Sequence, residues 1–307
     1  MTHSRRRCPR AWRALAAALV WASTAGVPLG VAAQQPNTRV LEALPVTIHY
    51  EPRYRRVSDK VAEICQAEIP RIAGELGLVR IQPIEIVVTH DARRYRANGA
   101  SDLPEWGIAF AILDEQRILV DVERATRAYN SLAEVVPHEL SHLLLRQRVT
   151  RVAFPIWFNE GLAQWQAREW SLVDSWRLMQ DVWIGSSPRL AEVSARYPKG
   201  EERAQSAYRL SYAAFTELFA ESGFGTLPAF LAEVERVGDF RSAFQSYWGF
   251  AVEDYAAYFQ DEMEKRYRTN ALAFESGPLL AFAAVLFIAV LVRQGIKRRR
   301  KYAQLDD

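Results

Sequence analysis

His138-Glu139-Leu140-Ser141-His142 is the stretch that decides which fold we expect for this chain of 307 residues. Two histidines four residues apart lie on the same face of an α-helix, about one turn from each other, so both imidazoles can bind one metal ion. The glutamate beside the first histidine can polarise a water molecule on that ion without itself being a ligand. With 5 histidines and 36 acidic residues in the chain, such a pattern is expected by chance only about 0.01 times.

A third ligand is needed, because a catalytic zinc site commonly has three protein ligands and one position left for water. Glu160 is the candidate, 18 residues past His142 on the next predicted helix. It stands among large apolar residues such as Trp157 and Phe158, where a carboxylate is costly to bury unless it is paired or metal-bound. An ordinary exposed helix glutamate is the alternative interpretation. We interpret His49 and His90, which lie on or just after early strands, as structural residues.

The remaining patterns predict strands before the motif and helices after it. The predicted strands are 46–50, 84–89, 107–113 and 117–122, the last two forming a hairpin or two neighbouring strands. The predicted helices are 57–76, the motif helix from about Asn130-Ser131, 156–170, 204–222, 225–238 and 252–268. Pro137 predicts that the motif helix either kinks there or begins nearer His138. This order indicates an α+β fold rather than a doubly wound sheet.

The first 33 residues have the pattern of a secretory signal peptide. Arginines precede an apolar run from Ala14 to Ala22, and Val31-Ala32-Ala33 is a small-residue cleavage pattern. An uncleaved anchor with the same sequence is the alternative. After cleavage Cys65 would be the only cysteine, so we expect no internal disulfide and interpret Cys65 as a small buried hydrophobic residue.

A second membrane signal lies near the C-terminus. Pro278–Val292 contains no charged residue, and the basic residues Arg293 and 297–301 follow it. A helix beginning at Ala271 would cover about 33 Å, enough for a hydrocarbon core of about 30 Å. We therefore predict a transmembrane helix at 271–292 and a basic cytoplasmic tail at 293–307. A buried amphipathic helix is the alternative, although no polar stripe interrupts the run.

These two ends define the expected organisation. Residues 34–270 would form one domain outside the cytoplasm, on the periplasmic side in a bacterium, on a single-pass protein of the cell membrane. The formal net charge is +3, of which residues 1–33 contribute +5 and residues 293–307 contribute +4, leaving −6 for residues 34–292. A mildly acidic domain gives no reason to expect a nucleic-acid partner.

The two segments that carry the candidate ligands together resemble a known family. His138–His142, followed by Pro155-Ile-Trp-Phe-Asn-Glu160-Gly-Leu-Ala163, resembles the gluzincin metallopeptidases, in particular the bacterial Peptidase MA-like families. The similarity includes the tryptophan three residues before the ligand glutamate and the Gly-x-Ala after it, and extends weakly over residues 46–266. The resemblance implies a zincin-like α+β fold with a small N-terminal sheet, the helix bearing residues 138–142, and a helical C-terminal half.

The resemblance also implies roles for individual residues. His138, His142 and Glu160 would hold one Zn²⁺ ion, with Glu139 as general base. The strand at Gly107 and Ala109 would bind the peptide substrate, and Tyr208 or Tyr212 would stabilise the oxyanion. At Gln164 some relatives have an aspartate that contacts a zinc histidine; glutamine can still accept a hydrogen bond there but has no charge.

The sequence therefore predicts a membrane-anchored, extracytoplasmic zinc peptidase that acts on a peptide or protein substrate. Two alternatives remain open: a non-catalytic, membrane-tethered zinc-binding or scaffold protein, and a zinc amidase acting on cell-wall peptides. The sequence does not disclose the substrate, endo- or exo-action, or the oligomeric state.

Overall fold

The computed structural model describes residues 37–90, 92, 109–123, 132–194, 200–274, 285 and 287–288. The signal peptide predicted at 1–33, and all but a few residues of the membrane span predicted at 271–292, lie outside the described residues. Within the part of the chain that the structure describes, every helix is too short or too polar to cross a membrane.

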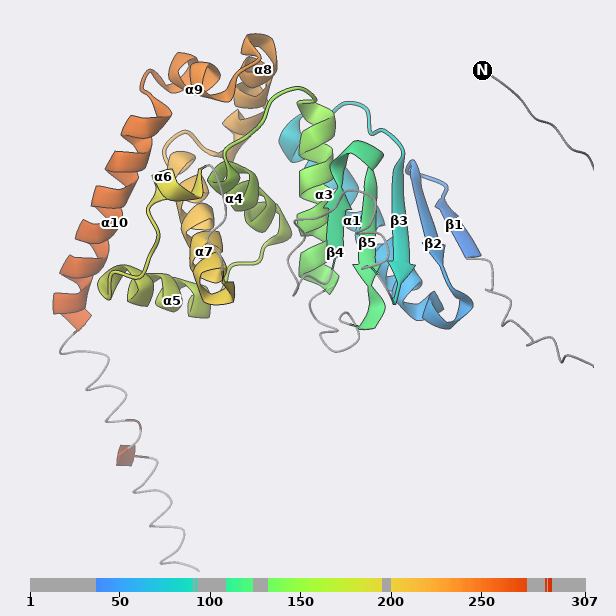
Figure 1. Cartoon of the computed structure of the whole chain (residues 1–307), viewed down its shortest axis with the longest axis horizontal. Helices are drawn as coiled ribbons and strands as arrows, with labels where there is room; N and C mark the ends of the chain where they lie inside the picture. The colour runs from blue at the N-terminus through green and yellow to red at the C-terminus, as the bar shows by residue number, and fades with distance from the viewer. Residues whose placement is uncertain are drawn as a thin grey trace, which may run out of the picture. The chain divides into compact units, whose positions relative to one another are not determined.

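A small mixed sheet forms the first half of the domain (Figure 1). Its strands, in spatial order, are β1 (Asn37–Leu41), β2 (Val46–Tyr50), β3 (Ile84–Thr89), β5 (Arg117–Asp121) and β4 (Ala109–Ile112). The three central strands are parallel, and β1 and β4 pair antiparallel at the two edges. The predicted hairpin is therefore confirmed, and β4, the strand predicted to bind substrate, is an edge strand.

The sheet buries one face against two long helices. Val46 pairs with Ile84 and Ile48 with Ile86, so the buried residues of neighbouring strands fall on the same face. They share one apolar core with the helices α1 (Arg55–Leu76) and α3 (Leu132–Arg148). Helix α1 ends where predicted, because Gly77 takes a left-handed conformation with φ of 64°.

The rest of the described chain is helical, which confirms the predicted α+β class. The helices are α4 (Ile156–Ala167), α5 (Leu172–Trp183), α6 (Leu190–Val193), α7 (Glu201–Leu218), α8 (Leu227–Val237), α9 (Phe240–Trp248) and α10 (Val252–Phe274). Short 3₁₀ turns lie at Pro52–Tyr54, Leu113–Glu115 and Phe224–Thr226. Figure 1 shows α3 between the sheet and these helices, in agreement with its contacts to both β4 and α4.

Several predicted boundaries need correction. The helix predicted at 204–222 is α7 at Glu201–Leu218, and within the described residues the strand predicted at 107–113 is β4 at Ala109–Ile112. Helix α3 runs through Pro137 from Leu132, so the alternative that it begins nearer His138 is wrong; the predicted cap at Asn130-Ser131 lies outside the described residues. The helix predicted at 156–170 ends at Ala167, because Arg168 takes a left-handed conformation with φ of 58°.

Candidate metal centre

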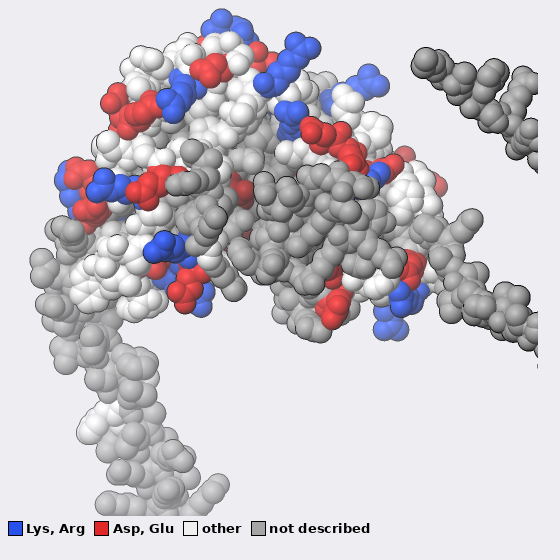
Figure 2. All heavy atoms as spheres, in the orientation of Figure 1, with Lys and Arg blue, Asp and Glu red and all other residues white. Residues whose placement is uncertain are grey.

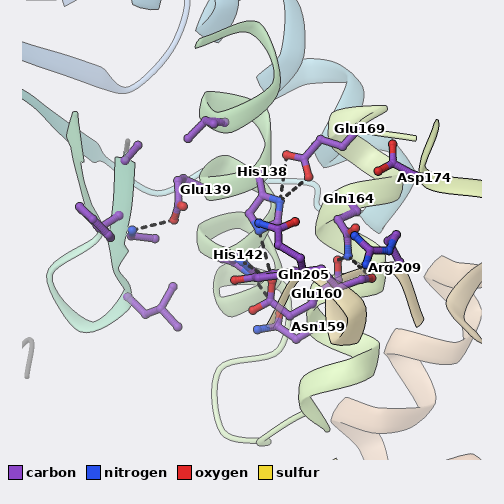
Figure 3. Close-up of a pocket in the computed structure, with 16 residues that line it drawn as sticks. His138, Glu139, His142, Asn159, Glu160, Gln164, Glu169, Asp174, Gln205 and Arg209 are labelled. Atoms are coloured by element: carbon purple, nitrogen blue, oxygen red, sulfur yellow. Dashed lines mark hydrogen bonds and ion pairs between the residues drawn. The ribbon is translucent and has the colours of Figure 1, made fainter. Parts of the chain in front are cut away.

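His138, His142 and Glu160 converge on one point between α3 and α4 (Figure 3). Glu160 Oε2 lies 3.2 Å from His138 Nε2 and 3.7 Å from His142 Nε2. One ligand atom from each of the three residues lies within 4.8 Å of the others. The prediction that Glu160 points back at the two histidines is confirmed, and this group could hold a metal ion.

Helix α4 is placed by close packing against α7. At Gly161, next to Glu160, an added Cβ would lie 2.3 Å from the Ser211 carbonyl oxygen and 2.5 Å from Phe215 Cβ. Glycine is therefore required here to let the two helices approach. On the same helix, Phe158 packs its ring against Phe215 and Phe240, with centroid distances of 5.3 and 5.2 Å. These contacts fix the position from which Glu160 reaches the histidines.

Each imidazole has a second partner on its other nitrogen. His138 Nδ1 lies 3.1 and 3.2 Å from the two carboxylate oxygens of Glu169. His142 Nδ1 lies 3.1 Å from Asn159 Oδ1. Such bonds fix the tautomer and the orientation of a metal-binding histidine, so that both Nε2 atoms face Glu160. Neither Glu169 nor Asn159 was predicted from the sequence.

Gln164 does not take the role that the resemblance implied. Its Nε2 donates to the backbone carbonyls of Tyr208, at 2.8 Å, and of Glu160, at 3.2 Å. It ties α4 to α7, and Glu169 provides the carboxylate that contacts the zinc-ligand candidate His138. His138 therefore has a charged partner, Glu169, even though position 164 is a neutral glutamine.

Glu139 points from α3 toward the edge strand rather than toward the histidines (Figure 3). Its Oε2 accepts a hydrogen bond of 2.7 Å from the Ala111 N–H on β4. Burial, together with the nearby charge of Glu160, raises the pKa of Glu139 to about 7, although His138 and the Ala111 N–H oppose the shift. A carboxyl group with a pKa near neutrality can both accept and return a proton.

The three ligand candidates shift one another's pKa. Burial alone would raise the pKa of Glu160, but the positive charges of His142 and His138 lower it below its usual value. Burial alone would lower the pKa of His138, yet Glu169 and Glu160 raise it well above the usual value. The pKa of His142 is lowered, mainly by burial. Without a metal ion, a proton on His138 offsets the buried carboxylates; a divalent cation would replace it.

A cavity of about 450 Å³ opens over this group. Ala109, Phe110 and Ala111 of β4 form one wall, and Tyr208 and Arg209 of α7 lie on another. The ring centroid of Tyr208 is 6.4 Å from that of His138, which places this candidate beside the site. The other lining residues are Leu113, Val135, His138, Glu139, His142, Asn159, Glu160, Gln164, Glu169, Asp174 and Gln205.

The remaining predicted residues divide into three groups. Ala109 lines the cavity, whereas Gly107 lies outside the described residues. Tyr212 stacks on Trp170 with a centroid distance of 4.2 Å and is not among the lining residues, so the geometry favours Tyr208 of the two tyrosines. His49 and His90 form surface hydrogen bonds with Thr38 and Arg53, as expected of structural histidines.

Comparison with known proteins assigns no activity. No protein-family model matches the chain. The chain is 24% identical over 197 residues to YhcO of Bacillus subtilis (strain 168), which is described as an uncharacterised protein. The match covers 61% of this chain and 57% of YhcO, so the chain spans little more than half of the relative's length.

Proposed function

We propose that the protein is a zinc-dependent peptidase of the gluzincin type. The observation that supports this most is the buried carboxylate of Glu160 between the Nε2 atoms of His138 and His142. Two imidazoles and one carboxylate are the donor set of many catalytic zinc sites, and a closed structural site would need a fourth protein ligand. Among the described residues, the group that could hold a metal ion consists of these three side chains.

A zinc ion held there would acidify a water molecule and polarise the scissile carbonyl. Glu139 would take the proton from the attacking water and return it to the departing amine. The Ala111 N–H keeps the Glu139 carboxylate against β4, at the side of the cavity where a substrate would lie. The Tyr208 hydroxyl is the candidate donor to the oxyanion.

The substrate would bind along β4. The Ala111 N–H points away from β5, since it reaches Glu139, and alternate residues of an antiparallel strand present their backbone groups to the same edge. The backbone of Ala109 therefore faces the cavity as well. A peptide could pair with this edge as an added strand. The proposed location is the outer side of the cell membrane, with one C-terminal anchor.

The Glu139→Gln variant tests the proposal. We expect it to bind zinc like the wild type and to lose hydrolysis by about 10²–10⁴-fold, because the base is removed while the ligands remain. Zinc would be measured by elemental mass spectrometry and hydrolysis with a random peptide pool. Glu63→Gln, an exposed position on α1, is the matched control.

The outcomes separate the alternatives. An unchanged turnover rate in Glu139→Gln would contradict the role of the base. A wild-type protein that binds zinc stoichiometrically and cleaves nothing would indicate the non-catalytic zinc-binding protein. Cleavage confined to cell-wall peptides, supplied as a second pool, would indicate the amidase.

A further inference from the structure

Helix α5 exposes a group of large apolar side chains. Leu172, Val173, Trp176, Trp183 and Ile184, the last at the C-cap, have between 51% and 90% of their surface exposed. Between residues 37 and 274 only three other large hydrophobic residues in the described part of the chain, Val40, Val79 and Tyr258, are comparably exposed, and they are scattered in the sequence. Contiguous exposed apolar surface marks an interaction site more often than isolated residues do.

The same helix already has a buried apolar face. Leu178 and Val182 are buried and face the domain core. Leu172, Trp176 and Trp183 are spaced four and seven residues apart, which places them together on a different side of the helix. Packing within the domain therefore accounts for one apolar face of α5 and leaves the second in contact with solvent.

The position of α5 indicates what covers that second face. Helix α5 contacts α10, and Figure 1 shows it beside the end of α10 at which the chain leaves the domain. Helix α10 ends at Phe274, four residues before the uncharged run Pro278–Val292. The transmembrane helix predicted at 271–292 begins within the last turn of α10, and four residues span at most about 14 Å, so the uncharged run also starts close to this end of the domain.

The chemistry of the face fits the surface of a bilayer. Tryptophan favours the boundary between lipid headgroups and hydrocarbon, and interfacial helices combine such residues with basic side chains. Arg177 on α5 and Arg189 after it are exposed, whereas the two acidic residues of the helix, Asp174 and Asp181, are half-buried. At the lower left of Figure 2, beside the grey trace, part of the surface over α5 is white, with basic and acidic groups next to it.

We propose that α5 lies in the headgroup region of the membrane, with Trp176 and Trp183 directed toward the lipid. The proposal depends on the predicted anchor and not on catalysis. The same helix contributes Asp174 to the wall of the metal cavity, so this docking would hold the cavity close to the bilayer surface.

Site-directed spin labelling of the full chain in liposomes of phosphatidylcholine and phosphatidylglycerol tests this. Labels would be attached to Trp183→Cys and, as a matched exposed control away from α5, to Val79→Cys. Burial raises the pKa of the Cys65 thiol to about 12, so the native protein should not be labelled there. The unmodified chain measures any background from Cys8.

We expect the label at position 183 to lose collisions with a water-soluble nickel chelate and to gain collisions with oxygen, while the label at 79 behaves as in water. Equal nickel accessibility at both positions would overturn the proposal. Spin–spin broadening at position 183 between copies would also overturn it, since a second copy would then cover the face. A label at Val285→Cys reports insertion of the anchor separately, and no readout depends on hydrolysis.

Discussion

Most proteins keep apolar side chains inside and charged ones outside. Helices α3 and α4 depart from this rule by holding charged groups inside, whereas α5 departs from it by holding apolar groups outside. The first two hold charged and polar groups, namely His138, Glu139, His142 and Glu160, largely out of solvent on the wall of a cavity. Helix α5 instead exposes large apolar side chains to solvent. Both arrangements cost free energy in an isolated domain, because buried charges lose water and exposed apolar groups order it.

Each region therefore contains an unfavourable arrangement that a partner from outside the domain would offset. In α3 and α4 the carboxylates and imidazoles offset one another in part, and a divalent cation would complete the compensation. In α5 a lipid surface would provide it. Four predictions test whether the two regions differ in this way, beginning with the largest expected effect.

The strongest prediction concerns Glu160→Gln. Zinc at a free concentration of 1,000 times its Kd should stabilise the wild type by about 4 kcal/mol, and the variant should lose most of this gain. The measurement is thermal unfolding with and without zinc, with Glu63→Gln as control. An equal zinc-induced rise in Tm in both variants would show that Glu160 is not a ligand.

The two faces of α5 should respond differently to truncation. Leu178→Ala should destabilise by about 2–5 kcal/mol, because it removes a buried side chain from the core. Leu172→Ala should change stability by no more than about 0.5 kcal/mol, because the side chain is exposed. Urea unfolding of the detergent-solubilised chain measures both. Comparable losses of stability in Leu178→Ala and Leu172→Ala would mean that the side chain of Leu172 is covered within the domain.

Gly161→Ala should displace the helix that positions Glu160. The added methyl group would meet the Ser211 carbonyl, and overpacking of this kind costs about 1–3 kcal/mol. Gly74→Ala on α1, where no atom lies within 4 Å, is the matched control and should be neutral or slightly stabilising. Zinc affinity should fall in Gly161→Ala alone; a fall in both variants would contradict the local explanation.

The fourth prediction concerns Glu169→Gln. The variant keeps the volume but loses the charged partner of His138 Nδ1, which should weaken zinc binding by about 10–100-fold. Competition against a zinc-binding dye measures the affinity. Glu134→Gln, which removes one negative charge from α3, should leave the affinity close to that of the wild type. Equal effects would indicate a general charge contribution rather than orientation of the imidazole.

Much of the fold could be predicted from local pattern. Strands 46–50 and 84–89 match β2 and β3. Both segments are rich in β-branched residues, and buried and half-buried positions alternate along them, as in a strand that buries one face. Strand β1 was missed because most of its residues are exposed and show no apolar alternation. Helix α5 was missed, although its sequence is amphipathic and Ser171 with Asp174 forms a capping box at its start. Helices α6 and α9 were also missed.

Local pattern also predicted part of the candidate site. The spacing of His138 and His142 is a local property of one helix, and a glutamate among large apolar residues was already an anomaly in the sequence. Asn159 and Glu169 gave no comparable signal, because polar residues beside a ligand or after a helix end are common. Their roles depend on how α4 and the residues after its end lie relative to α3.

The sequence alone determined that two imidazoles share a helix face and that a carboxylate follows on the next helix, since helical periodicity fixes the first and composition indicates the second. Only the tertiary structure decided which groups hold these side chains in place. Glu169 lies 31 residues from His138, and Ala111 lies 28 residues from Glu139. Contacts over such separations depend on how α3, α4 and the sheet pack together, and no local pattern contains that information.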